Sequence, residues 1–305
     1  MIGFGSWLTI GGTVDVKTGN TLIRTAFDNG INFFDTADVY SSGKSEIFLG
    51  KTLSAFRRRD LFIASKCFWP MSDNINDKGL SRKHIFESVH ESLRNLKTDY
   101  IDLYQCHRYD NDTPVEETCR AFNSLIEQGK ILYWGVSEWS KANISEAVNV
   151  CGKLNLHKPV SNQPQYSLLY RDIEYNGVMD YCEKKGIGQV VWSPLGQGVL
   201  TGKYNIKKEA GKDTRLGHEK YNVFVKKLAV EENLKKVEKL MQIARELNTT
   251  ASCLSLAWCL RKEIVSATIT SATKLNQLKE NIKAAGINIP ADVIKKIDEI
   301  FKIKK

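Results

Sequence analysis

Long apolar runs are absent from this chain of 305 residues. No stretch approaches the roughly 18 consecutive apolar residues that a membrane-spanning helix needs, so we expect no membrane insertion. Residues 1–5 contain neither the basic segment nor the apolar stretch of a secretory signal peptide. Together these absences predict a cytoplasmic protein.

Cysteine pairs are also missing. The chain has seven cysteines, an odd number, and no two of them form a Cys-x-x-Cys pair. This spacing suits neither a zinc site nor a disulfide framework, so we expect no metal site. We interpret the cysteines as small core residues in a reducing compartment.

Motifs of several common enzyme classes are lacking as well. No Gly-x-Ser-x-Gly turn of a hydrolase occurs, and His90 has no second histidine at the spacing of a zinc-protease helix. Residues 50–52 resemble the end of a phosphate-binding P-loop, but Ser45 stands at the required upstream glycine and the segment has a helical pattern. We therefore discard these classes.

Positive charge exceeds negative charge, with 44 Lys and Arg against 35 Asp and Glu and a net charge of +9. Many lysines occur as scattered pairs, such as Lys207-Lys208 and Lys235-Lys236, interleaved with glutamates along helical patterns. This arrangement is typical of solvated helix faces, so we expect no nucleic-acid partner. A net positive charge does favour an anionic, phosphate-bearing ligand.

Apolar β-type segments alternate with amphipathic helical segments along the whole chain. Such alternation predicts parallel strands, and the strand count favours an α/β fold, a closed (β/α)₈ TIM barrel forming a single domain over residues 1–305. The rival is an open doubly wound sheet, but its usual Gly-x-Gly-x-x-Gly turn after the first strand is absent. We predict strands over 2–5, 31–35, 61–66, 100–106, 131–136, 160–162, 189–192 and 267–270, and helices over 18–29, 45–55, 81–96, 114–128, 141–154, 173–184, 231–247, 252–261 and 274–284.

Boundary residues support these elements. Thr113 is the expected N-cap of the helix over 114–128, with Pro114 at its first position. Residues 205–230 form a long connection after the seventh strand, rich in lysine and glycine. Long loops at this end of barrel strands are commonly lids or binding loops.

Three successive strands end in ionisable side chains, namely Asp35, Lys66 and His107, and Tyr40 follows Asp35 by five residues. In a barrel such positions share one mouth, where they form a proton-transfer site. Lys66 would lower the pKa of Tyr40, Asp35 would hold Lys66 charged, and His107 would share a substrate oxygen with Tyr40. The reaction that needs this set is hydride addition to a carbonyl, with the hydride coming from a cofactor. A plain ion pair between Asp35 and Lys66 at the barrel rim is the alternative.

Several segments together resemble the aldo-keto reductases: residues 34–40, Lys66, 106–107, 135–137 and 192–195. Within that superfamily, residues 79–85 and 133–135 look closest to the branch that holds voltage-gated potassium channel β subunits and their bacterial reductase relatives. The resemblance implies that Asp35, Tyr40, Lys66 and His107 form a catalytic tetrad with Tyr40 as general acid. It also implies NADP(H) across the barrel mouth and a small carbonyl substrate.

The same resemblance implies a set of cofactor-binding residues. Ser137 and Gln163 would grip the nicotinamide carboxamide, and Tyr166 would stack on its ring. Thr273 and Lys274 begin a helix whose N–H groups favour the 2′-phosphate of NADP over NAD. The full implied set comprises Gly5, Trp7, Ser137, Gln163, Tyr166, Trp192, Ser193, Pro194, Leu195, Gly198, Lys203, Arg215, Thr273, Lys274, Gln277, Glu280 and Asn281.

Some features depart from the family pattern. Glu138 stands where relatives often carry asparagine or arginine, and Ser271 stands where a glycine is usual. The first strand begins almost at Met1, so we expect no counterpart of the N-terminal hairpin that closes the barrel floor in the family. Three tryptophans, Trp7, Trp69 and Trp139, are candidates for the walls of the substrate pocket.

Three functions remain open at this point. The first is an NADPH-dependent carbonyl reductase, and the second is an NADP-binding regulatory subunit like the channel β subunits, with weak or no turnover. The third is a barrel that keeps the fold without the chemistry. The sequence names neither the natural substrate nor the oligomeric state, and a homo-oligomer stays open.

Overall fold

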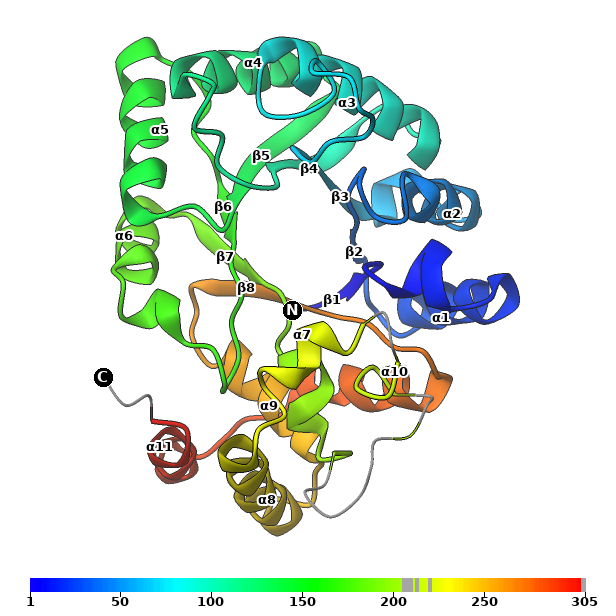
Figure 1. Cartoon of the computed structure of the whole chain (residues 1–305), viewed down its shortest axis with the longest axis vertical. Coiled ribbons are helices and arrows are strands. Elements are labelled where there is room, and N and C mark those ends of the chain that lie inside the picture. Colours follow the sequence, from blue (N-terminus) through cyan, green and yellow to red (C-terminus); the bar gives the residue numbers. More distant parts are fainter. Residues whose placement is uncertain (205–210, 212–213, 219–220, 303–305) are drawn as a thin grey trace.

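The computed structural model describes residues 1–204, 211, 214–218 and 221–302, and it confirms the predicted barrel. Parallel strands follow one another around the barrel in chain order, and the last pairs with the first, where Phe4 lies opposite Thr270 (Figure 1). The strands are β1 (Ile2–Gly5), β2 (Phe33–Asp35), β3 (Phe62–Cys67), β4 (Ile101–Cys106), β5 (Ile131–Ser137), β6 (Ser161–Gln163), β7 (Gly188–Val191) and β8 (Val265–Thr270).

Helices surround the barrel on its outer side (Figure 1). They are α1 (Val16–Asp28), α2 (Lys44–Leu53), α3 (Arg82–Leu96), α4 (Val115–Glu127), α5 (Lys141–Leu154), α6 (Val178–Lys185), α7 (Val223–Lys226), α8 (Glu231–Glu246), α9 (Ala251–Leu260), α10 (Leu275–Ile282) and α11 (Ala291–Ile300). Short helical turns occur at η1 (Thr9–Thr13), η2 (Arg58–Asp60), η3 (Asp172–Glu174), η4 (Gly196–Thr201) and η5 (Lys283–Gly286).

The structure corrects the predicted helices in several places. The segment predicted as one helix over 173–184 is divided into η3 and α6, because Gly177 adopts a left-handed conformation between them. Helix α11 was not predicted, although Ile297 on its inner face is fully buried. The N-cap role expected for Thr113 is wrong: its hydroxyl donates to Asp110 Oδ2 at 2.8 Å, and α4 begins after Pro114 without a side-chain cap.

Successive side chains of each strand point alternately into and out of the barrel, and this produces two separate hydrophobic cores. Inward-facing residues, among them Phe33, Ala64, Leu103 and Ile269, fill the lower part of the barrel together with Phe62. The rings of Phe33 and Phe62 meet edge to face at 5.6 Å. Because these side chains fill the interior, the barrel is a packed core, and polar groups gather above it at the carboxyl ends of the strands.

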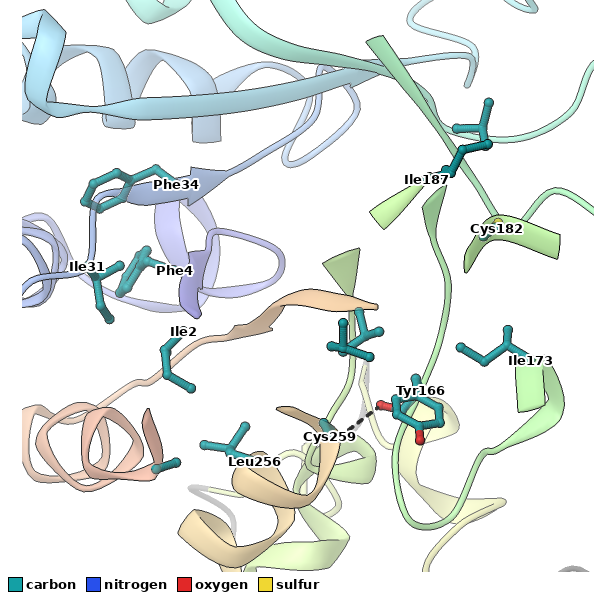
Figure 2. Close-up of a cluster of buried hydrophobic side chains, with 14 of the residues drawn as sticks. Ile2, Phe4, Ile31, Phe34, Tyr166, Ile173, Cys182, Ile187, Leu256 and Cys259 are labelled. Carbon is teal, nitrogen blue, oxygen red and sulfur yellow. Dashed lines mark hydrogen bonds between the residues drawn. The ribbon is translucent and has the colours of Figure 1, made fainter. Parts of the chain in front are cut away.

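Outward-facing residues form the larger core between the strands and the helices. Phe4 and Phe34 belong to this layer, with ring centroids 6.0 Å apart, and Leu256 of α9 packs there too (Figure 2). All seven cysteines are buried and unpaired, as expected of core residues. Within the described part of the chain, no helix is both long enough and apolar enough to cross a bilayer.

Helices α2 and α3 approach closely at Gly50. A Cβ atom at this position would lie 2.5 Å from the backbone carbonyl carbon of Leu96, a distance that real Cβ atoms essentially never show. Gly152 in α5 offers a contrast, because a Cβ atom there would meet nothing within 4 Å. One glycine is required by packing, and the other only weakens its helix.

We therefore predict opposite effects for two matched substitutions. Gly50→Ala should lower the free energy of unfolding by about 1–3 kcal/mol, since the helices must separate. Gly152→Ala should raise it by about 0.5–1 kcal/mol through better helix propensity. Urea unfolding monitored by circular dichroism measures both changes, and a neutral Gly50→Ala variant would contradict the packing argument.

Candidate active site

The carboxyl ends of β2 and β3 bring Asp35 and Lys66 together in the barrel. The Lys66 ammonium donates to Asp35 Oδ1 at 2.7 Å and to the backbone oxygen of Thr36 at 2.6 Å, and it lies 3.4 Å from the Tyr40 hydroxyl. Lys66 is fully buried, and Asp35 is 3% exposed. The close approach expected between Lys66 and Tyr40 is therefore present.

The pKa of Lys66 reflects two opposing effects. Burial disfavours the ammonium, but the negative charge of Asp35 and the hydroxyl of Tyr40 favour it more strongly, so the pKa of Lys66 is raised. Lys66 thus stays protonated at neutral pH and holds a permanent positive charge next to the Tyr40 hydroxyl.

Tyr40 corrects one expectation from the sequence. Burial raises the pKa of its hydroxyl, and the opposing charge of Lys66 offsets this rise without reversing it. The net pKa of Tyr40 therefore lies above its ordinary value, contrary to the expectation of an acidified phenol. The hydroxyl is protonated at neutral pH, with a cation in place to stabilise the phenolate that forms when the proton leaves.

His107 follows β4 and packs edge to face against Tyr40, with ring centroids 5.7 Å apart. Burial, together with the charges of Lys66 and Arg108, holds the pKa of His107 well below its usual range. The imidazole is therefore neutral at pH 7 and carries one donor and one acceptor nitrogen. Its Nδ1 atom is buried and has no hydrogen-bond partner among the described residues.

A second layer of polar side chains supports Asp35. The amide of Gln163 donates to Asp35 Oδ2 at 2.8 Å, and the Ser137 hydroxyl donates to the backbone oxygen of Gln163 at 2.8 Å. Both Ser137 and Gln163 therefore lie at the mouth, where the sequence predicted them. In this structure, their polar atoms hold the carboxylate and the end of β6.

Trp192 and Tyr166 differ in where their rings lie. Trp192 is partly exposed just after β7, and its indole N–H donates to Glu138 Oε1 at 2.9 Å. The carboxylate of Glu138 also accepts from the backbone N–H of Gln165 at 2.5 Å. Glu138, a departure from the family pattern, thus fixes the aromatic ring at the end of β7.

Tyr166 instead points into the outer core (Figure 2). It is fully buried, its ring stacks on Trp258 at 5.2 Å, and its hydroxyl contacts Glu174 and accepts from Arg261 at 2.8 Å. The expectation that Tyr166 stacks on a nicotinamide ring is therefore wrong. Its partners come from α9, the residue after α9 and η3, so its ring is held outside the barrel.

The turn after β7 has an unusual backbone. Ser193, Gly196, Gln197 and Gly198 all have positive φ angles, with Gly198 at 93°. A φ of this value favours glycine at position 198, and a Cβ atom there would lie 3.0 Å from the ammonium of Lys203, which shows how close the lysine comes to this turn. Pro194 is buried beneath this turn, and Leu195 is partly exposed.

The connection after this turn folds back over the loop that follows β1 and Gly5. The guanidinium of Arg215 contacts Gln197 and lies 5.7 Å from the ring centroid of Trp7. Phe224 of α7 packs edge to face on Trp7 at 5.2 Å. The predicted binding loop is confirmed only to this extent, since its residues 205–210, 212–213 and 219–220 lie outside the described part.

The start of α10 presents polar groups to solvent. Thr273, Lys274 and Gln277 are exposed, and Gln277 Oε1 accepts from the backbone N–H of Thr273 at 3.1 Å. Glu280 accepts from Lys283 at 2.8 Å. Asn281 is buried and donates to the Thr270 hydroxyl at 3.1 Å, and the Ser271 hydroxyl lies 2.7 Å from that of Thr9.

Two of the tryptophans considered as pocket walls differ in their exposure to solvent. Trp69 is 37% exposed, and its ring lies 6.2 Å from that of His107, which fits a wall of the mouth. Trp139 is buried against Tyr109, so it belongs to the core and the wall assignment is wrong for it. Sequence reasoning also missed Arg108 and Phe224, which lie beside His107 and Trp7.

No group of three or more His, Cys, Asp or Glu side chains in the described ranges is arranged to hold a metal ion. The mouth itself carries an ammonium, a carboxylate, a phenol and an imidazole. A protonated phenol beside a cation can give a proton to an oxygen, and a neutral imidazole can orient that oxygen.

The lowered pKa of His107 makes a prediction for acid stability. The unfolded chain binds a proton at this histidine as the pH falls below about 6.5, while the folded chain does not, so stability is lost in that range. Between about pH 7 and pH 5.5 the native chain should lose about 1 kcal/mol more unfolding free energy than His107→Asn. Urea unfolding at both pH values measures this, and equal losses would contradict a neutral buried imidazole.

Comparisons with known proteins agree with the fold. The profile of the Aldo/keto reductase family matches residues 1–302. Proteins named as probable voltage-gated potassium channel β subunits from Oryza sativa subsp. japonica and Arabidopsis thaliana are each 41% identical to this chain over 308 residues, covering 99% of it and 93% of the relative. A crystal structure of a thermostable aldo-keto reductase bound to the inhibitor epalrestat is 31% identical, with a TM-score of 0.78 and coverage of 98% of this chain and 94% of that one. On this sequence match and this shared barrel, the chain belongs to the aldo/keto reductase family.

Proposed function

We propose that this chain reduces aldehydes or ketones to alcohols with NADPH. The observation that carries the proposal is the Lys66 ammonium, which is bonded to Asp35 and lies 3.4 Å from the protonated hydroxyl of Tyr40. The neutral imidazole of His107 lies against the same phenol ring.

The chain's own residues divide the proton chemistry among them. Tyr40 gives its proton to the carbonyl oxygen as general acid, and Lys66 stabilises the phenolate that remains. Asp35 keeps Lys66 protonated and fixed in position, helped by the amide of Gln163. His107 donates a hydrogen bond to the same carbonyl oxygen and so orients the substrate. NADPH, when bound, supplies the hydride.

The groups around the mouth fit a phosphorylated dinucleotide. Trp192 is partly exposed and so offers an aromatic ring to a ligand, which the buried Tyr166 does not. The turn at Gly198 lies close to the Lys203 ammonium. Arg215 and Lys274 add positive charge, the latter at the exposed start of α10, which supports NADP over NAD. We assign cofactor binding to Gly5, Trp7, Ser137, Gln163, Trp192, Ser193, Pro194, Leu195, Gly198, Lys203, Arg215, Thr273, Lys274, Gln277, Glu280 and Asn281.

A cytoplasmic location is part of this proposal. All seven cysteines are unpaired, which suits a reducing compartment where NADPH is also available.

A second candidate function is a regulatory subunit of a voltage-gated potassium channel. It is favoured by the relatives of that name at 41% identity. Recording channel currents with and without this chain tests it. A change in gating that persists in Tyr40→Phe would support a role separate from turnover, and unchanged currents would remove the candidate.

The reductase proposal predicts a large loss of activity in Tyr40→Phe. NADPH oxidation, followed at 340 nm with aldehydes such as methylglyoxal and 4-nitrobenzaldehyde, should fall on the order of 100-fold or more, because the general acid is gone. The matched control is Tyr175→Phe, since Tyr175 is 55% exposed and lies outside the mouth. The same assay with NADH in place of NADPH compares the rates with the two cofactors.

The fold of each variant is checked by circular dichroism, so that a loss of activity can be assigned to chemistry. Wild-type NADPH consumption no faster than that of Tyr40→Phe on every aldehyde tested would refute the proposed reaction.

A further inference from the structure

Arg108 is a cation at the mouth that the proposed proton chemistry does not use. It directly follows His107, and its side chain is partly exposed. One guanidinium nitrogen, Nη1, donates to the His107 backbone oxygen at 2.5 Å and lies 3.4 Å from the Ser137 hydroxyl. The guanidinium carbon is 5.6 Å from the ring centroid of Trp69, a cation–π distance that holds the side chain in place.

Three carboxylates of this region, those of Asp35, Glu138 and Asp110, are bonded to groups other than Arg108. Asp35 accepts from Lys66 and Gln163, and Glu138 accepts from Trp192 and from the backbone of Gln165. Asp110 accepts from the backbone N–H groups of Leu80 and Asp112 and from the hydroxyl of Thr113. Among the described residues, no ion pair involves Arg108.

Arg108 therefore adds a positive charge to the mouth that no ion pair within the described part of the chain cancels. Lys66 and Asp35 cancel each other, and His107 is neutral, so Arg108 contributes one positive charge beside the phenol and the imidazole. A partly buried guanidinium without an anion is costly unless something else satisfies its remaining N–H groups. Its planar fork matches the two oxygens of a carboxylate.

We propose that Arg108 forms an anion subsite, so that the preferred substrates are aldehydes or ketones bearing a carboxylate at the far end of a short spacer. The carbonyl lies at Tyr40 and His107, the carboxylate lies at the free edge of the guanidinium, and the ring of Trp69 covers the spacer. This inference rests on the proposed carbonyl reduction, of which it names the substrate class.

The test compares an acid with its neutral ester. The probes are 4-carboxybenzaldehyde and methyl 4-formylbenzoate, which differ in charge but share the reacting aldehyde. Arg108 also lowers the pKa of Tyr40 and of His107, so its loss affects every substrate, and the ratio of kcat/KM for acid and ester removes this common effect. Wild-type protein should favour the acid on the order of tenfold or more.

In Arg108→Gln this preference should fall to near unity, mainly through KM for the acid. Arg108→Lys should keep part of it, because the charge remains while the fork is lost. The control is Arg120→Gln on the outer face of α4, where Arg120 is about half exposed and pairs with Glu116. An unchanged ratio in Arg108→Gln, or a matching rise in KM for NADPH, would overturn the inference.

A binding measurement separates this inference from the reductase proposal. Calorimetry on protein saturated with NADPH compares 4-(hydroxymethyl)benzoate with its methyl ester, and no turnover occurs because an alcohol cannot accept a hydride from the reduced cofactor. Tighter binding of the acid that is lost in Arg108→Gln supports the subsite even if no aldehyde is reduced. Equal binding of acid and ester by wild-type protein refutes the subsite even if both aldehydes are reduced.

Discussion

The buried ion pair between Lys66 and Asp35 determines how the rest of the mouth is arranged. Removing two charges from water costs several kcal/mol for each ion, and their mutual attraction offsets this only when the remaining hydrogen-bonding groups are satisfied. The backbone oxygen of Thr36 and the amide of Gln163 meet that need. The end of β6 is in turn held by Ser137. A charge pair on two neighbouring strands thus fixes the positions of side chains from two others, β5 and β6.

Burial has opposite consequences for the groups around this pair. It raises the pKa of Tyr40 and lowers the pKa of His107, so both are neutral at pH 7. Lys66 stays charged because Asp35 and Tyr40 together outweigh the effect of burial on its pKa. The result is a fixed cation among neutral donors. Such a site can stabilise negative charge that develops on an oxygen without first moving a proton of its own.

Much of this arrangement could be predicted from the sequence, because local patterns determine it. The strand segments, the order of the barrel and the three polar strand ends follow from alternation and spacing. The orientation of Tyr166 could not be predicted, since its side chain is held by Trp258, Arg261 and Glu174. The first two are far from it in the sequence, and no local pattern indicates the contact with Glu174. The net pKa of Tyr40 is also a balance of burial against charge, and burial is known only once the fold is known.

The ion pair between Lys66 and Asp35 forms only in the observed register of the strands. Asp35 pairs with Ala64 and Lys66 with Gln105, so both charged residues share the inward face with Ala64 and Leu103. If β3 shifted its register by one residue, the Lys66 side chain would point outward into the hydrophobic core between the strands and the helices, away from Asp35. Misaligned sheets are therefore penalised far more heavily than a purely aliphatic barrel would penalise them. The residues proposed for chemistry therefore also favour the correct strand register when the barrel folds.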